Sequence, residues 1–156
     1  MIKRIVSGGQ TGADRAALDA ALETGFPCGG YCPKHREAED GPIDIRYPLI
    51  EIDGGYAERT RKNVEEADGT LIVFRSPIRG GTRLTREYCI QSQKPCLPID
   101  FVTIPQAQVF EDLKSFIARH EIAVLNVAGP RASDCPDVYG YVHDLIQKLC
   151  LDSRVD

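Results

Sequence analysis

The chain has 156 residues, of which 42% are hydrophobic and 27% charged, and its formal net charge is −4. This composition is typical of a globular protein and argues against disorder, and the length suits one domain, residues 1–156, with a substantial core. The acidic balance argues against a nucleic-acid partner, because a basic surface is needed to neutralise a phosphate backbone. The net charge does not exclude a small anionic ligand that binds in a locally basic pocket.

Targeting and membrane signals are absent from the sequence, so we expect no membrane partner. Only a few apolar residues follow the first basic ones, which is too short for a signal-peptide core, and no apolar run is long enough to cross a bilayer. The six cysteines form no recognisable disulfide framework for a chain of this length. A cytoplasmic location under reducing conditions is the simpler interpretation.

The first stretch with a functional pattern is a strand, a glycine-rich turn and a helix in direct succession. An apolar run at 2–6 predicts a buried strand, the turn SGGQTG occupies 7–12, and the helix extends to Glu23. Such turns bind anions, because glycines let the backbone approach a ligand and the helix N-terminus presents unpaired N–H groups. The alternative is that this turn is an ordinary tight connection between strand and helix, without a ligand. Side-chain donors could come from Gln10, Thr11 and Arg15.

The next segment, 28–43, is rich in Gly and Pro and is expected to be a long functional loop. It places Lys34 beside two further potential cations. A short strand is expected within 47–52 and a helix over 56–66. Spacing puts a group of polar side chains on one face of that helix, namely Arg59, Thr60 and Asn63.

The remainder of the chain alternates strands and helices. The apolar run at 70–74 predicts a central parallel strand, and the loop after it leads to Thr82, expected to cap a helix running to about Gln93. The other expected elements are strands at 96–99 and 124–128 and helices at 106–120 and 137–151.

This alternation predicts an α/β fold with a mostly parallel central sheet covered on both faces. Ligands bind such sheets beyond the carboxyl ends of the strands. Three loops are expected at that edge, each pairing glycine with hydroxyl or cationic side chains: 7–12, 76–82 and 129–133. They bring Ser76 and Arg131 to the candidate site, where Arg131 is well placed to clamp a phosphate.

Five stretches resemble the motifs of the molybdenum carrier proteins, a branch of the superfamily that includes the lysine-decarboxylase-like "lonely guy" proteins. They are SGGQTGADRAALDAAL, GGYCPKHREAEDGPI, RTRKNVEEADGTLIVF, RGGTRLTREY and LNVAGPRAS, and together they cover the chain from Ile5 to about Tyr141. The resemblance implies a Rossmann-like three-layer sandwich that forms a homo-oligomer, a dimer or tetramer. It also implies a nucleotide-like phosphorylated ligand or molybdenum cofactor, a pterin that carries a phosphate.

Carried over residue by residue, the resemblance marks positions in the loops and on the second helix. These are Gly8, Gly9, Gln10, Thr11, Gly12, Arg59, Thr60, Asn63, Gly80, Gly81, Thr82, Asn126, Gly129, Pro130 and Arg131. One departure concerns the catalytic glutamate of the superfamily's phosphoribohydrolases, which lies three residues after the motif threonine. Here Glu87 lies five residues after Thr82 and an inner glycine is missing, which favours binding over hydrolysis.

Two functions therefore stand, a carrier without catalytic residues and a nucleotide hydrolase of the N-glycosidase or phosphoribohydrolase type. A carboxylate beside the glycine loops would favour the enzyme, whereas donors and cations alone would favour the carrier. For Asp14, complementarity to the helix dipole is the favoured interpretation.

The cysteines lack the paired spacing of a structural zinc site, so no metal site is predicted. Cys32 is expected to pack against the sheet, or else to be a thiolate with a depressed pKa beside Lys34 and Arg36.

Overall fold

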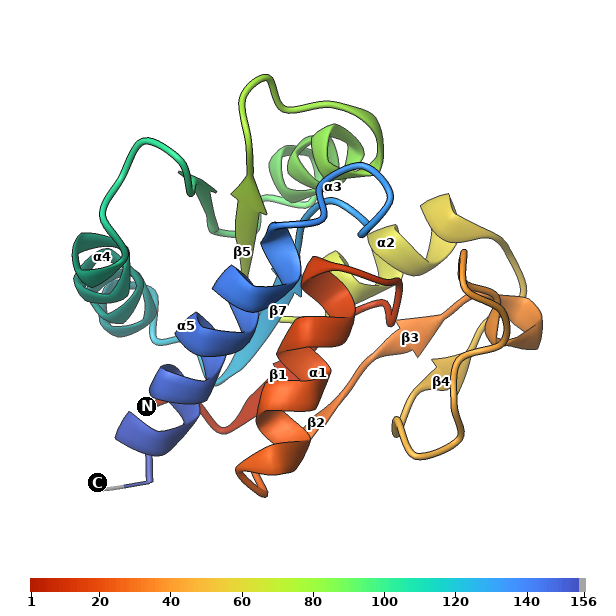
Figure 1. The fold of residues 1–156 in the computed structure, drawn as a ribbon, viewed down its shortest axis with the longest axis horizontal. Coiled ribbons are helices and arrows are strands. Elements are labelled where there is room, and N and C mark those ends of the chain that lie inside the picture. The colour runs from red at the N-terminus through yellow and green to blue at the C-terminus, as the bar shows by residue number, and fades with distance from the viewer. Residues whose placement is uncertain (155–156) are drawn as a thin grey trace.

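The computed structural model describes residues 1–154, which form an α/β fold around a five-stranded sheet of order β2-β1-β7-β5-β6 (Figure 1). Every pairing among the described strands is parallel. The strands of this sheet are β1 (Arg4–Val6), β2 (Cys28–Gly29), β5 (Gly69–Phe74), β6 (Cys96–Asp100) and β7 (Val124–Ala128). The predicted parallel sheet is confirmed.

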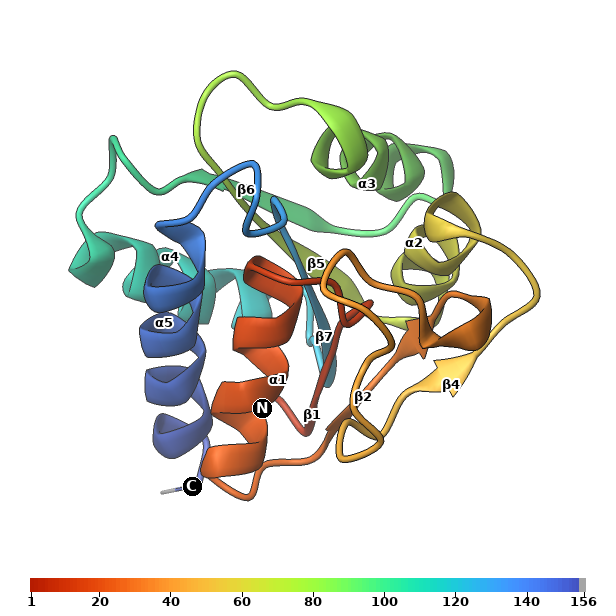
Figure 2. The same cartoon turned by 45° about the vertical axis from the view of Figure 1, so that its right-hand side comes forward.

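Helices cover both faces of the sheet, as the predicted Rossmann-like sandwich requires (Figure 2). One layer contains α1 (Ala13–Glu23), α4 (Gln106–Arg119) and α5 (Val138–Asp152). The opposite layer contains α2 (Tyr56–Glu66) and α3 (Gly80–Gln91). None of the helices in residues 1–154 has the length and hydropathy that a bilayer crossing demands.

Small side chains let α1 pack closely between the sheet and α5. Ala16, Ala17, Ala20 and Ala21 are completely buried, so the α1 backbone can approach both neighbours. Beneath it, Ile5 of β1 pairs in register with Leu125 of β7, and both are fully buried. This packing fixes where β1 ends and therefore where the first glycine-rich loop begins.

The segment expected to be a long loop, 28–43, holds two strands that the sequence did not predict. β2 adds to the edge of the main sheet, and β3 (Tyr31–Cys32) pairs with β4 (Ile50–Glu51) in a separate two-stranded sheet. Gly30 lies between them with a φ of +127°, and a Cβ there would clash with the backbone oxygen of Ser7. Two-residue strands carry no periodicity, which explains why they were missed.

The start of α3 also differs from the prediction. The helix begins at Gly80 rather than after Thr82, and no side chain caps it. Thr82 is instead buried in the first turn. This difference matters for the site, because it places two glycines inside the first turn of a helix.

Candidate functional site

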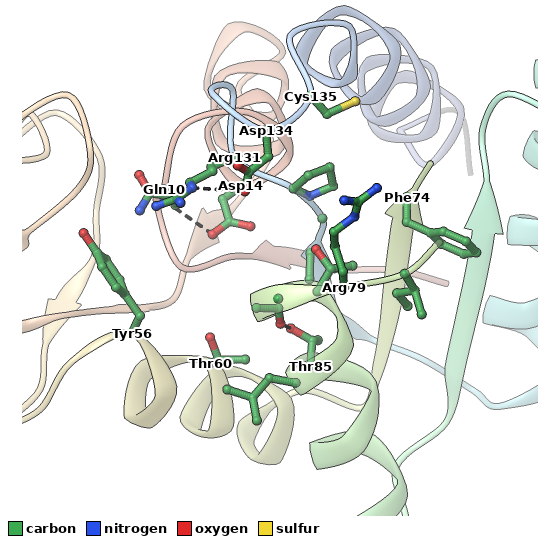
Figure 3. A pocket seen from close by; sticks show the side chains of 18 of the residues that line it. Gln10, Asp14, Tyr56, Thr60, Phe74, Arg79, Thr85, Arg131, Asp134 and Cys135 are labelled. Atoms are coloured by element: carbon green, nitrogen blue, oxygen red, sulfur yellow. Dashed lines mark hydrogen bonds and ion pairs between the residues drawn. The ribbon is translucent and has the colours of Figure 1, made fainter. Parts of the chain in front are cut away.

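A cavity of about 520 Å³ opens at the carboxyl edge of the sheet, where β1, β5 and β7 end (Figure 3). All three glycine-containing loops predicted to converge reach this region. Nine predicted residues line the cavity: Gln10, Arg59, Thr60, Gly80, Gly81, Thr82, Gly129, Pro130 and Arg131. Its volume lies within the range of small-molecule sites in proteins.

Three predicted residues line a small recess alongside the cavity instead, and two of these have structural roles. The side-chain amide of Asn63 accepts from the N–H of Tyr31 and donates to its carbonyl, both at 2.9 Å, so it joins α2 to β3. Asn126 donates to the hydroxyl of Thr70 on the neighbouring strand at 3.3 Å. The third residue is Gly8, where the guanidinium of Arg59 lies so close that a Cβ would clash with it.

The remaining predicted residues do not line the cavity, and their contacts explain why. Gly9 faces the apolar side chains of Ile43 and Leu49, and Gly12 packs against the backbone of 130–132. The other four interact with polar side chains: Thr11 with Glu39, Arg15 with Asp40, Lys34 with Asp53, and Ser76 with Asp100.

Two N–H groups of the first glycine-rich loop form hydrogen bonds to nearby side chains. The N–H of Gln10 donates to Asp14 at 3.3 Å, and the N–H of Thr11 donates to the side chain of Gln10 at 3.0 Å. The amide oxygen of Gln10 also accepts from the N–H of Glu39 at 2.9 Å. These N–H groups are therefore not free to bind an anion, although the loop borders the cavity.

At the N-terminus of α3, by contrast, the backbone N–H groups are unpaired in the described chain. The N–H groups of Gly80, Gly81 and Thr82 have no acceptor among residues 1–154, as expected in the first turn of a helix. A Cβ added at Gly80 or Gly81 would meet no atom within 4 Å, so this turn is open to an incoming group. The helix dipole makes such a turn attractive to an anion.

Arg79, directly before this turn, is a cavity residue that the sequence analysis did not select. Its side chain forms no ion pair within the described part of the chain, and Figure 3 shows it directed into the cavity. The signal in the sequence is its position in the loop after β5, immediately before Gly80 and Gly81.

A buried ion pair forms part of the cavity wall. Arg59 of α2 lies with Nη1 3.2 Å from Oδ2 of Asp14 on α1, and their side chains are 13% and 5% exposed. Burial raises the pKa of Asp14, while the Arg59 charge and the N–H of Gln10 oppose that rise. The Nε of Arg59 is buried and has no hydrogen-bond partner among the described residues. Asp14 thus places a carboxylate beside the glycine loops.

Arg131 lines the cavity but is already engaged by acidic neighbours. Its Nε lies 3.1 Å from Asp134 and 3.7 Å from Glu39. The Glu39 carboxylate also accepts hydrogen bonds from Ser133 and Thr11, which hold the pKa of Glu39 below its usual value. Glu39 therefore fastens the segment after β3 to the first and third loops.

Glu87 does not line the cavity. It lies on α3 and pairs with Arg83 one turn earlier at 3.4 Å, and both side chains are largely exposed. Glu87 therefore differs from the superfamily's catalytic glutamate in its sequence spacing, and it also lies outside the cavity.

The cysteines do not gather into a metal site in the described chain. Cys32 and Cys135 belong to separate apolar clusters, and residues 1–154 contain no grouping of three His, Cys, Asp or Glu side chains suited to a metal ion. Burial raises the pKa of Cys32 and outweighs the effect of Arg36, so the alternative of a low-pKa thiolate at this position is wrong. Cys32 also lies outside the residues that line the cavity.

The fold and the cavity define an α/β protein with a ligand-sized site at the carboxyl edge of a parallel sheet. Residues 5–150 match the circularly permutated YpsA SLOG family, and the chain belongs to that family.

One solved structure shares both sequence and fold with this chain. It is described as a "Putative molybdenum carrier protein" from Syntrophus aciditrophicus SB, and the two chains are 45% identical with a TM-score of 0.92. The match covers 94% of this chain and 93% of that one. No curated protein matches the chain.

Proposed function

We propose that the chain binds a small phosphorylated ligand of the nucleotide or pterin type in this cavity and acts as its carrier. The observation that carries the proposal is the open first turn of α3 beside Arg79, which has no ion pair among residues 1–154. Unpaired N–H groups and a guanidinium together form a favourable site for a phosphate. The name of the similar structure supports a carrier role for this chain.

The residues present fit molybdenum cofactor as a cargo. The open turn of α3 would hold its phosphate, and the buried, unpartnered Nε of Arg59 is a donor for the polar rim of a pterin ring. We further propose that the protein works in the cytoplasm as a homo-oligomer without a nucleic-acid partner, consistent with its net charge of −4.

A pair of matched glycine substitutions tests the proposal. Gly81 and Gly140 both lie in the first turn of a helix, and a Cβ at either would meet nothing within 4 Å, but only Gly81 lines the cavity. Gly81→Asp puts a carboxylate where the phosphate is expected, so affinity for phosphorylated ligands should fall at least about tenfold, or about 1.4 kcal/mol. Gly140→Asp should bind as the wild type does.

The measurement is titration calorimetry with GMP, AMP and neopterin monophosphate, with circular dichroism to check folding. Equal affinity in Gly81→Asp and the wild type would remove the α3 turn from the site. Equal losses in Gly81→Asp and Gly140→Asp would point to a general effect of added charge.

A nucleotide hydrolase is the second candidate, and the position of Asp14 in the cavity wall favours it. A buried carboxyl with a raised pKa is suited to acid–base chemistry. However, Asp14 is already bound by Arg59 and by the N–H of Gln10. We therefore expect binding without turnover.

Release of free base from nucleoside monophosphates, followed by liquid chromatography, separates the two functions. Turnover that is lost in Asp14→Asn and kept in Glu87→Gln would establish the hydrolase with Asp14 as its carboxylate. No release by the wild type is the result expected of a carrier.

A further inference from the structure

The Asp14–Arg59 pair lies in the cavity wall apart from the open turn of α3. It joins α1 to α2, whereas the proposed phosphate site is at the start of α3. An ion pair this buried is not needed for stability, since apolar residues of similar volume often serve as well. Its place in a ligand cavity suggests a role in recognition.

The pair offers an acceptor and a donor side by side. The Asp14 carboxylate is acceptor-only when ionised, and Arg59 carries five N–H donors, of which the buried one on Nε has no partner in the described chain. The Nη1 of Arg59 is held by Asp14 at 3.2 Å, which fixes the guanidinium in place. A ligand group that donates to the carboxylate and accepts from the guanidinium would satisfy both.

The surroundings of the pair suit a planar ring. Tyr56 lines the same cavity, and its ring lies 5.7 Å from the Arg59 guanidinium. Figure 3 shows Tyr56 reaching from α2 toward Gln10, with Arg79 on the far side of Asp14. A flat heterocycle beside Tyr56 would present its polar edge to Asp14 and Arg59, while its phosphate lay toward Arg79.

We propose that Asp14 and Arg59 recognise the 2-amino-4-oxopyrimidine edge that guanine and pterin rings share. The ring N–H and the exocyclic amine of that edge donate to the Asp14 carboxylate, and its oxo group accepts from Arg59. Adenine presents an unprotonated ring nitrogen at the corresponding position, which an ionised carboxylate repels, and hypoxanthine lacks the amine. This inference rests on the proposed function, because it requires a phosphorylated ligand in the cavity.

Ligand series with the unaltered protein test the proposal. GMP, IMP and AMP share ribose and phosphate and differ at the base edge, so calorimetry should find GMP bound at least about tenfold more tightly than the others. In the pterin arm, neopterin monophosphate should bind more tightly than its lumazine analogue, in which an oxo group replaces the amine. The series that contains the tighter-binding compound shows whether the protein binds a guanine or a pterin ring.

Equal binding within both series would overturn the recognition of this edge while leaving the proposed phosphate site intact. Absence of binding to every compound would instead contradict the proposed function, and this inference with it.

A variant tests whether Asp14 is the residue that distinguishes GMP from AMP. Asp14→Asn replaces one acceptor by a donor of the same size, so the preference for GMP over AMP should be lost while AMP still binds. Asp19→Asn is the matched control on the same helix, because Asp19 accepts from Tyr47 and Tyr139 and does not line the cavity. An unchanged GMP preference in folded Asp14→Asn would overturn the proposal, and if that variant does not fold, the ligand series decides.

Discussion

At the scale of single residues, the Asp14–Arg59 pair combines a cost in stability with a proposed role in binding. Burying two charges is unfavourable, and the pair is tolerated because each ion compensates the other and the N–H of Gln10 adds a hydrogen bond. The sequence interpretation of Asp14 as a partner of the helix dipole considered α1 alone. It could not include Arg59, which is 45 positions away in the chain.

Removing one member of this pair should be strongly destabilising. Arg59→Leu leaves the Asp14 charge buried without its partner, and we expect a loss of about 3–5 kcal/mol in the free energy of unfolding. The control is Arg61→Leu on the same helix, which breaks an exposed pair with Glu65 and should change stability little. Urea unfolding measures both, and equal effects would contradict the importance of burial.

The penalty of Arg59→Leu should also depend on pH. Loss of the guanidinium raises the folded-state pKa of Asp14 beyond the rise that burial already causes. A carboxyl with a raised folded-state pKa is most favourable when protonated, at low pH, and its contribution is lost as pH rises through that pKa. The stability difference from wild type should therefore shrink as the pH is lowered from 7, and a constant difference would contradict this account.

Two arginines of the cavity should differ in their importance for binding. Arg79 has no ion pair among the described residues, so Arg79→Lys should lose about 1–3 kcal/mol of affinity for GMP or neopterin monophosphate through loss of bidentate hydrogen bonding. Arg131 already faces Asp134 and Glu39, so Arg131→Lys should lose less than about 1 kcal/mol. Calorimetry that ranks the two in the reverse order would make Arg131 the principal clamp.

At the scale of elements, the sequence predicted the regular parts well because their patterns are long and local. The bounds expected for 56–66 and 124–128 are those of α2 and β7. The short strands β2 and β3 were missed because two residues show no alternation. Which glycines face the cavity was also not predictable, because it depends on packing between distant segments, such as Gly9 against Leu49.

The segment after β3 should depend on Glu39 for its attachment. The Glu39 carboxylate accepts two hydrogen bonds from Ser133 and one from Thr11, and Glu39→Ala removes all three. Amide hydrogen exchange in residues 34–49 should then become faster, while exchange in α4, which lies elsewhere in the fold, should stay unchanged. Unchanged exchange in 34–49 would show that the other contacts of the segment, such as the Arg15–Asp40 pair and the hydrogen bond from the N–H of Glu39 to Gln10, suffice to hold it.

At the scale of the whole molecule, the site follows from the parallel arrangement of the strands. Because β1, β5 and β7 all end at one edge of the sheet, residues as distant as Gln10, Arg79 and Arg131 border one cavity. This convergence was predictable from the alternation of strands and helices. The division of roles between the loops was not, since the N–H groups of Gln10 and Thr11 form internal hydrogen bonds, whereas those at the start of α3 have no acceptor among residues 1–154.

Native mass spectrometry of the freshly purified protein tests the central claim, that this cavity holds a phosphorylated small molecule, most directly. We predict a retained small molecule of defined mass, or one acquired on incubation with GMP or neopterin monophosphate, in the wild type and in Gly140→Asp. That added mass should be absent from Gly81→Asp. Spectra without added mass in all three proteins after incubation, or with the same added mass in all three, would contradict the account.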